Sequence, residues 1–343
     1  MVILKQLPGV LLPWYEENKR DLPWRQTKEP YHIWLSEIML QQTRVEAVKG
    51  YYARFLERLP SIEALADCDD EALHKLWEGL GYYSRVRNLK KAAIEIMSTY
   101  GGEFPTQYDN ILALPGIGAY TAGAISSIAF GQPTPAVDGN VLRVLSRLRA
   151  DGECVDLPVH KKRVDRELAQ VYPRDKAAEF TQALMELGAT VCIPNGEPKC
   201  GQCPCGEFCK SRDGGWKQYP VRQPKKKRRI EDKTVFVLRC GDCWALHKRP
   251  DKGLLAGLWQ FPDTPGFLEP EEAVAWLEGR GLQPVNLERM VERNHIFTHI
   301  EWKMRGYYLT VREMNEEFVW MEERSVEGIA ALPTAYRQFW EEK

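Results

Sequence analysis

The sequence predicts a mostly α-helical region followed by a smaller α+β domain. Up to about residue 210, apolar residues recur at helical spacing, whereas after residue 233 they follow the shorter period of strands. A basic segment that contains Pro220 and Pro224 separates the two patterns. We therefore expect a helical region over residues 1–214, a linker over 215–233 and an α+β domain over 234–343. A chain of 343 residues, 44% of them apolar, is long enough to bury a core in each part.

The composition excludes a disordered or fibrous protein, and a net charge of −1 means that any binding to nucleic acid must use a local patch. The N-terminus lacks the features of a signal peptide, so we expect a cytoplasmic protein. Residues 110–137 contain no charged residue and no histidine. Glycines and prolines interrupt this stretch, so we expect a buried turn and a buried helix and no contact with a membrane.

Three stretches of the first half show helical spacing most clearly, and glycines follow two helices there. The apolar positions are Trp34, Leu35, Ile38 and Met39; Leu73, Leu76, Trp77 and Leu80; and Val164, Leu168 and Val171, and the glycines are Gly79, Gly81, Gly101 and Gly102.

In the second half, a two-residue turn at Gly241-Asp242 joins two predicted strands, and one helix begins at a proline. The predicted strands are Thr234–Arg239, Trp244–Lys248, His295–Val311 and Phe318–Met321, and the predicted helix is Pro270–Glu278.

The motif Leu114–Ala122 contains two glycines, Gly116 and Gly118, directly before a predicted helix. Such a turn lets a ligand approach the backbone, and the free N–H groups of the helix N-terminus can bind phosphate. The alternative is an ordinary turn between two helices. The basic residues of the linker present a similar choice between a solvated segment and a second contact with phosphate.

Two carboxylates stand out. Asp138 lies twenty residues after Gly118, at the end of the uncharged stretch, where it either serves chemistry or caps the helix Val141–Leu148. Glu37 lies on an apolar helical face, where burial would raise its pKa and make it a usable acid near neutral pH. The alternative for Glu37 is a side chain that reaches solvent or pairs with Arg25 or Arg44.

Five of the nine cysteines fall between Cys192 and Cys209. The spacing Cys192-x7-Cys200-x2-Cys203-x5-Cys209 predicts a metal site, either zinc or an iron–sulfur cluster, with Cys205 as a bystander. Cys240 and Cys243 flank a turn and supply too few ligands for a closed site, so we expect a plain hairpin there.

Together, the glycine turn, Asp138 and the cysteine loop resemble the helix-hairpin-helix superfamily of DNA glycosylases that carry a [4Fe–4S] cluster. The strings Leu22–Arg25, Trp34–Thr43 and Gly79–Tyr83 are similar to those of the MutY-type adenine DNA glycosylases. That resemblance implies a hydrolase of base excision repair that binds duplex DNA and removes adenine mispaired with 8-oxoguanine, and also with guanine. With it we expect a monomer that is associated with the nucleoid if the protein is bacterial. It also implies one [4Fe–4S] cluster on Cys192, Cys200, Cys203 and Cys209.

By this resemblance, Glu37 protonates adenine and later activates water, while Asp138 stabilises the cationic sugar. The target adenine must be flipped out of the duplex. Several further residues would contact the substrate. Trp24, Arg25 and Gln182 would line the adenine pocket, Gln42 and Tyr82 would lie at the lesion, and Thr43 and Leu80 belong to the same motifs.

Tyr120 stands where related endonuclease-III-type enzymes have a lysine that forms a Schiff base and cuts the strand. A tyrosine cannot form an imine, so the resemblance implies base removal without an efficient lyase step. Two alternatives stay open: a bifunctional glycosylase/lyase and a non-catalytic DNA-binding iron–sulfur protein. A structural zinc module is a further option.

The segment Leu254–Pro262 resembles the Nudix-like domain of this family, but the magnesium-binding helix of a Nudix hydrolase is missing after Glu271-Glu272. We therefore expect this domain to bind and not to hydrolyse. The resemblance assigns recognition of 8-oxoguanine to the loop Phe297-Thr298-His299, for which a half-buried strand is the alternative. Two features depart from the family. Seven residues, not six, separate Cys192 from Cys200, and Thr298 replaces a serine, which puts fine discrimination of the lesion in doubt.

Overall fold

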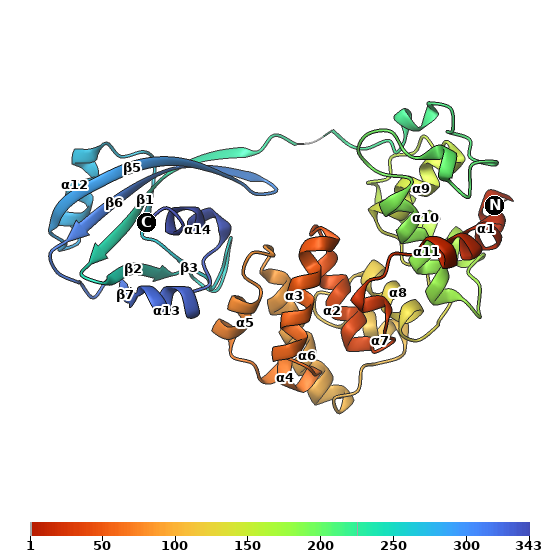
Figure 1. Ribbon diagram of the computed structural model, residues 1–343, viewed down its shortest axis with the longest axis horizontal. Coiled ribbons are helices and arrows are strands. Elements are labelled where there is room, and N and C mark those ends of the chain that lie inside the picture. Colours follow the sequence, from red (N-terminus) through yellow and green to blue (C-terminus); the bar gives the residue numbers. More distant parts are fainter. Residues whose placement is uncertain (1, 225) are drawn as a thin grey trace. The chain divides into compact units, whose positions relative to one another are not determined.

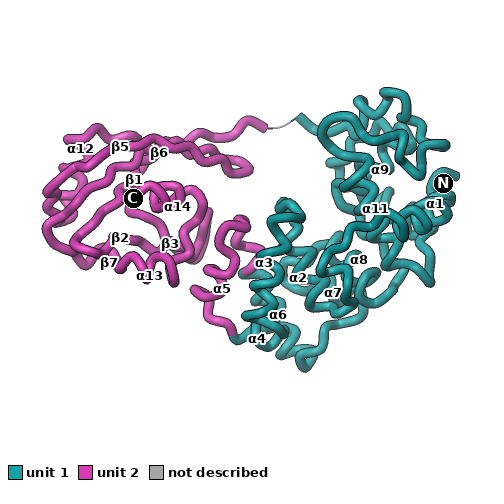
Figure 2. The backbone as a smooth tube through the Cα atoms, viewed as in Figure 1, with its two compact units in different colours: residues 1–67, 87–224 teal, residues 68–86, 225–343 magenta. Residues whose placement is uncertain are grey.

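The computed structural model describes residues 2–224 and 226–343, which form two compact units. Figure 2 shows them: unit 1 contains Met1–Asp67 and Arg87–Pro224, and unit 2 contains Cys68–Val86 and Lys225–Lys343. A short piece of the first half of the sequence therefore belongs to the same unit as the C-terminal residues. The boundaries predicted at residues 214 and 233 remain a prediction.

Unit 1 is built from helices (Figure 1), with short 3₁₀ turns at Pro23–Arg25, Cys200–Gln202 and Gly215–Gln218. The helix α6 (Ser84–Tyr100) begins in unit 2 and continues in unit 1. The other helices of unit 1 are α1 (Val2–Asn18), α2 (Pro30–Leu40), α3 (Val45–Arg58), α4 (Ile62–Asp67), α7 (Tyr108–Ala113), α8 (Ala119–Ile128), α9 (Gly139–Arg149), α10 (Pro158–Ala169) and α11 (Ala177–Thr190).

One core of unit 1 joins α1, α9 and α11. Leu4, Leu7 and Leu11 of α1 are fully buried against Leu145 of α9 and Leu187 of α11. Burial of a leucine side chain stabilises the fold by roughly 2 kcal/mol, so this contact fixes α11 firmly. Since α9 and α11 carry residues that line the candidate site, the core sets the positions of two of its walls.

The uncharged stretch forms the predicted buried turn and buried helix. The turn joins α7 to α8, and every residue of α8 from Thr121 to Ile128 is buried. Gly123 lies inside α8, and a Cβ there would be 1.9 Å from the carbonyl oxygen of Pro135. Glycine at this position therefore allows the backbone of residues 135–136 to lie directly on the helix. Within the described residues, no helix is long and apolar enough to cross a membrane.

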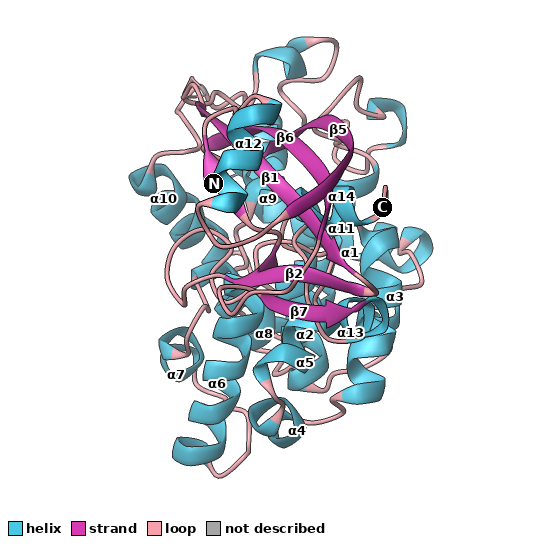
Figure 3. Ribbon diagram, turned by 90° about the vertical axis from the view of Figure 1, so that its left-hand side faces the viewer, coloured by secondary structure: helices cyan, strands magenta, loops and turns pink. Residues whose placement is uncertain are grey.

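Unit 2 contains a seven-stranded mixed sheet (Figure 3). Its main order is β3-β2-β1-β6-β5, β4 pairs with β1, and β7 pairs with β2. Among the strand pairings of the described residues, only that of β1 with β6 is parallel. The strands are β1 (Arg229–Cys240), β2 (Cys243–Lys248), β3 (Trp259–Gln260), β4 (Asp263–Pro265), β5 (Pro284–Ile296), β6 (Ile300–Val311) and β7 (Val319–Glu322), and the helices are α5 (Asp70–Leu76), α12 (Pro270–Glu278), α13 (Glu323–Gly328) and α14 (Thr334–Trp340).

Alternate residues of β1 enter two different cores. Val235 and Val237 pack with Tyr336 and Phe339 of α14, whereas Phe236 and Leu238 pack with residues of α12. Successive side chains of a strand point to opposite faces of the sheet, so both faces of β1 are covered. The helices α14 and α12 cover opposite faces of the sheet.

Most predicted elements of unit 2 are confirmed, including the turn at Gly241-Asp242 and the helix Pro270–Glu278. The prediction of one strand over His295–Val311 is wrong. The chain turns at residues 297–299, and a long strand, β5, precedes the turn. The side chains of β5 are mostly exposed, including Val285 and Met290, so the sequence lacks the apolar alternation that would reveal it.

Candidate active site

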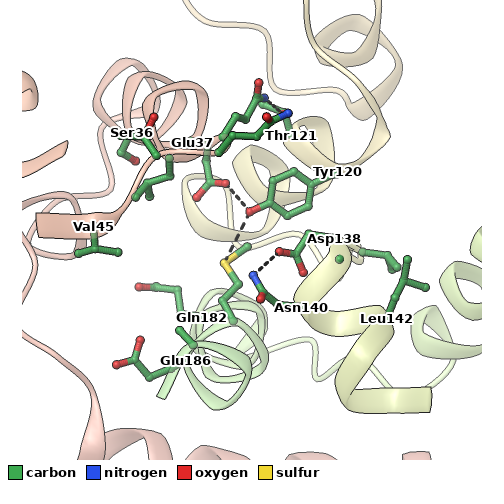
Figure 4. Close-up of a pocket in the computed structure, with 18 of the residues that line it drawn as sticks. Ser36, Glu37, Val45, Tyr120, Thr121, Asp138, Asn140, Leu142, Gln182 and Glu186 are labelled. Carbon is green, nitrogen blue, oxygen red and sulfur yellow. Dashed lines mark hydrogen bonds between the residues drawn. The ribbon is translucent and has the colours of Figure 1, made fainter. Parts of the chain in front are cut away.

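A cavity of about 770 Å³ lies in unit 1, and side chains from α2, α8, α9 and α11 line it (Figure 4). Its volume lies within the range of ligand pockets. The cavity brings together nine of the residues predicted for the site. They are Trp24, Arg25, Glu37, Gln42, Thr43, Gly118, Tyr120, Asp138 and Gln182.

Glu37 reaches the cavity from α2, which begins at Pro30 and is buried along most of its length. The residue is only 5% exposed. Burial is the main cause that raises the pKa of Glu37 to about 7. The hydrogen bond from Tyr120 and the charge of Arg25 act against this rise, and the nearby Asp138 acts in the same direction as burial. The predicted burial and raised pKa are confirmed. Glu37 is therefore protonated in a large share of molecules at neutral pH.

Tyr120 stands in the first turn of α8 and donates a hydrogen bond of 2.7 Å to Oε2 of Glu37. Burial and the two nearby carboxylates raise the pKa of Tyr120 well above its usual value, so the phenol keeps its proton. Figure 4 shows the phenol between Glu37 and Asp138. No local pattern reveals this contact, because 83 residues separate the two partners.

Asp138 caps α9. Its Oδ1 accepts a hydrogen bond of 2.7 Å from the backbone of Val141, and its Oδ2 accepts one of 2.7 Å from Asn140. The capping role is confirmed, and the same carboxylate lines the cavity. Burial raises the pKa of Asp138, although the hydrogen bonds from Val141 and Asn140 oppose this rise. Asp138 can therefore cap α9 and face the cavity at the same time.

The wall formed by α11 holds Gln182 and Glu186. The hydroxyl of Tyr15 donates to Oε1 of Gln182 at 3.0 Å, which leaves the amide nitrogen as the donor toward a ligand. Glu186 is fully buried and receives hydrogen bonds from Arg20 and Arg25 at 2.6 to 2.9 Å. Burial acts to raise the pKa of Glu186, but the two arginines outweigh it and lower the pKa. Sequence reasoning missed these two ion pairs, because Glu186 lies 166 residues from Arg20 and 161 residues from Arg25.

Gln42 lies just after α2 with a φ of 62°, a conformation that side chains other than glycine rarely adopt. Strained backbone of this kind concentrates at functional sites. Trp24 contributes a buried ring to the same cavity and packs edge-on against Tyr52, with the ring centroids 5.5 Å apart.

The glycine turn places Gly116 and Gly118 before α8. Gly116 has a φ of 77°, and a Cβ there would be 2.6 Å from Cβ of Asn88, so the turn requires glycine. Gly118 is the N-cap residue of α8, and no side chain caps this end. The first N–H groups of α8 are thus available to an anion.

Arg222, from the predicted linker, also lines the cavity. Its guanidinium lies 3.1 Å from Oδ1 of Asp156, and Oδ2 of the same carboxylate accepts a hydrogen bond from the backbone of Gln223. Asp156 thereby attaches the start of the basic segment to unit 1.

The four predicted metal ligands, Cys192, Cys200, Cys203 and Cys209, line one small cavity of about 30 Å³. Cys205 does not line it and is instead buried in the hydrophobic core. Arg147 donates to the sulfur of Cys192 at 3.5 Å. Four thiols beside a guanidinium fit an anionic iron–sulfur cluster. In the described part of the chain, no three His, Cys, Asp or Glu side chains converge as ligands of a single ion.

The remaining predicted contact residues belong to unit 2. Residues 297–299 form the turn between β5 and β6, closed by a hydrogen bond of 2.8 Å from the N–H of Phe297 to the carbonyl of Ile300. Phe297 packs on Trp302, while Thr298 and His299 are exposed. The predicted loop is confirmed, and the alternative of a strand is wrong.

Tyr82 is the second predicted lesion contact in unit 2. It is 48% exposed, has a φ of 47°, and its hydroxyl lies 3.1 Å from Oγ1 of Thr298. Leu80, in contrast, is buried.

Comparison with known proteins identifies the two parts. Residues 35–174 match the HhH-GPD superfamily of base excision DNA repair proteins, and residues 234–342 match the NUDIX domain. A structure of a thermostable thymine-DNA glycosylase superposes with a TM-score of 0.57 at 29% identity, covering 63% of this chain and 97% of that chain. A trapped endonuclease III–DNA intermediate gives a TM-score of 0.52 at 23% identity, covering 63% of this chain and 96% of that chain, which shows the same fold.

Adenine DNA glycosylases are similar along most of the sequence. The human protein is 35% identical over 88% of this chain, which spans 66% of the human protein's length. Two proteins from Buchnera aphidicola, of the strains APS and Bp, are 35% and 32% identical. These alignments cover 84% and 94% of this chain and 82% and 93% of the two relatives. The chain therefore belongs to the family of adenine DNA glycosylases.

Proposed function

We propose that this protein is a monofunctional DNA glycosylase that hydrolyses the N-glycosidic bond of adenine mispaired with 8-oxoguanine, and also with guanine, in duplex DNA. One observation carries the proposal. A buried glutamic acid, Glu37, with a pKa of about 7 shares a cavity with a second carboxylate, Asp138. An acid and an anion in one site are the two groups that cleavage of a glycosidic bond requires.

The residues divide the work as follows. Adenine is flipped into the cavity, where the amide of Gln182 and the ring of Trp24 bind it. Glu37 donates its proton to N7 of the base, which then leaves as neutral adenine. Asp138 stabilises the positive charge that develops on the sugar, either as an ion pair or through an adduct. Glu37, now a carboxylate, removes a proton from the water that completes hydrolysis.

The absence of a lyase step is inferred from Tyr120. A Schiff base needs an amine, and the phenol of Tyr120 instead donates a hydrogen bond to Glu37. Lys161 is the lysine among the described residues that line this cavity, and its side chain is exposed. A trapping experiment must therefore include Lys161→Ala as a control for adventitious imine formation.

The test uses a defined duplex with A opposite 8-oxoguanine, and duplexes with A opposite G and A opposite T as comparisons. We expect adenine release from the first two, none from the third, and strand breaks only after treatment with alkali. Glu37→Gln should bind the same DNA without releasing adenine. Release of no base by the wild type would favour a DNA-binding protein without catalysis. Borohydride trapping that survives Lys161→Ala would favour the bifunctional enzyme.

For the DNA, we propose that the N-terminus of α8 at Gly116 and Gly118 binds a phosphate and that Gln42 and Tyr82 lie at the lesion. Phe297, Thr298 and His299 read 8-oxoguanine. Exposed backbone and side chains at a turn suit recognition of a nucleic acid.

We also propose that Cys192, Cys200, Cys203 and Cys209 hold one [4Fe–4S] cluster. The cluster would hold the loop after α11 in place. The matched variants are Cys200→Ser and Cys205→Ser, since Cys200 lines the small cavity and Cys205 does not. We expect the wild type and Cys205→Ser to be brown with about four irons per chain, and Cys200→Ser to lose most of this absorption. A colourless protein that contains one zinc ion per chain would contradict the cluster and favour a structural zinc module.

A further inference from the structure

The segment Cys68–Val86 packs with the C-terminal residues in unit 2, although it lies in the first half of the sequence. Four of its side chains, Glu71, Lys75, Glu78 and Tyr82, follow each other at intervals of four, three and four residues. This spacing puts the first three on one side of α5 and the turn that follows it. Each of the four bonds to the C-terminal part of unit 2. The partners are Lys248 for Glu71, the carbonyl of Ala330 for Lys75, Leu332 and Arg337 for Glu78, and Thr298 for Tyr82.

Glu78 is the most buried of these groups, with 8% of its side chain exposed. Its Oε1 accepts a hydrogen bond of 2.9 Å from the backbone of Leu332, and its Oε2 lies 2.8 Å from Arg337 and 2.9 Å from Lys75. A buried carboxylate that meets an N–H group and two cations is a strong anchor, because loss of the carboxylate leaves those groups unpaired. The pair of Glu71 and Lys248 is a third to a half exposed and contributes little.

The three residues between Glu78 and Tyr82 are held by hydrogen bonds within the segment. The indole of Trp77 donates to the carbonyl of Gly81 at 3.1 Å, and Arg85 donates to the carbonyls of Leu80 and Gly81 at 3.0 and 3.2 Å. The guanidinium of Arg85 also lies over the rings of Trp77 and Tyr82. A displacement of Glu78 is therefore transmitted to Tyr82, whose backbone is strained at a φ of 47°.

We propose that Glu78 is a positioning residue for recognition of the mispair. By fixing the segment on the C-terminal part of unit 2, Glu78 holds the hydroxyl of Tyr82 beside Thr298, so that the two form one preorganised reading surface for the base opposite adenine. The inference rests on the proposed function, because that function makes Tyr82 and Thr298 contacts to the lesion. It adds a residue that touches no DNA and acts through Tyr82.

The experiment measures the affinity for duplexes that contain a non-hydrolysable adenosine analogue opposite 8-oxoguanine or opposite guanine. We expect Glu78→Ala to reduce the preference for 8-oxoguanine about three- to tenfold, the size of one hydrogen bond, with adenine release at saturating enzyme nearly unchanged. Glu78→Gln, which can still accept the hydrogen bond from Leu332, should recover part of the preference. Glu71→Ala is the matched control on the same side of the segment and should keep the wild-type preference.

A double-mutant cycle separates positioning from general destabilisation. If Glu78 acts through the contact between Tyr82 and Thr298, Glu78→Ala should reduce the preference little further in a Tyr82→Phe background. Additive losses, or an unchanged preference in both Glu78 variants, would overturn the inference. A wild type that shows no preference for 8-oxoguanine over guanine, or releases no adenine, would instead contradict the proposed function. Thermal unfolding of each variant identifies any that do not fold, and Glu78→Gln then carries the test.

Discussion

The cavity of unit 1 and the turn of unit 2 are built in opposite ways. Around the cavity, Glu37 and Glu186 are buried, and each meets a specific hydrogen-bond donor. At the turn, Thr298 and His299 are exposed. Proton transfer benefits from burial, because desolvation moves the pKa of a carboxyl toward neutral pH, whereas reading a base within a duplex requires accessible groups. The comparison indicates that changes in the cavity should affect rate and changes at the turn should affect selectivity.

The largest effect is expected from Glu37→Gln. The amide keeps the size of the side chain but cannot donate a proton as an acid, so adenine release should fall by about 10³- to 10⁴-fold. The dissociation constant for the DNA should change little, and this is checked by single-turnover kinetics and a binding titration. Turnover close to that of the wild type would remove Glu37 from its proposed role and, with it, the contrast between the two regions.

Asp138→Asn separates the cap from the chemistry. Asparagine is also a good N-cap, so the melting temperature should stay close to that of the wild type. The loss of the negative charge should slow adenine release by about 10²- to 10³-fold. If the rate is nearly normal, Asp138 serves only as the cap of α9.

The pH dependence of adenine release sharpens the assignment of Glu37. Only the protonated acid is active in the first step, so the single-turnover rate should fall about tenfold per pH unit once the pH exceeds about 7. The hydrogen bond from Tyr120 lowers the pKa of Glu37. Tyr120→Phe should therefore move the midpoint of this decline to higher pH. A midpoint that stays in place, or moves down, would show that another group titrates.

The smallest effect is expected at the turn. Thr298→Ala removes one hydroxyl, so the preference for 8-oxoguanine over guanine should fall about three- to tenfold while the rate at saturating enzyme is kept. Thr298→Ser retains the hydroxyl and serves as the control. A loss of rate that is equal on both duplexes would contradict the separation of chemistry from recognition.

Sequence reasoning succeeded where the information is local. The cap at Asp138 and the helix Pro270–Glu278 follow from a few adjacent residues, and both are confirmed. The buried face that carries Glu37 is equally local, since it is read from the period of one helix.

Sequence reasoning failed where a feature depends on residues far apart in the chain or leaves no apolar pattern. The contacts of Glu37 with Tyr120 and of Glu186 with Arg20 join residues far apart in the chain, so no spacing reveals them. The strand β5 was missed because its exposed side chains leave no apolar alternation. The membership of residues 68–86 in unit 2 depends on tertiary contacts that no local pattern contains.

The close approach of the backbone at Gly123 affects the distance between Tyr120 and Asp138. Tyr120 lies one turn before Gly123 on α8, and Asp138 follows Pro135 by three residues. The missing side chain at position 123 thus sets the spacing between the phenol that serves Glu37 and the opposing acid. Even a methyl group at position 123 would push α8 and residues 135–136 apart. The geometry of the site therefore depends on a residue that has no side chain and takes no part in the reaction.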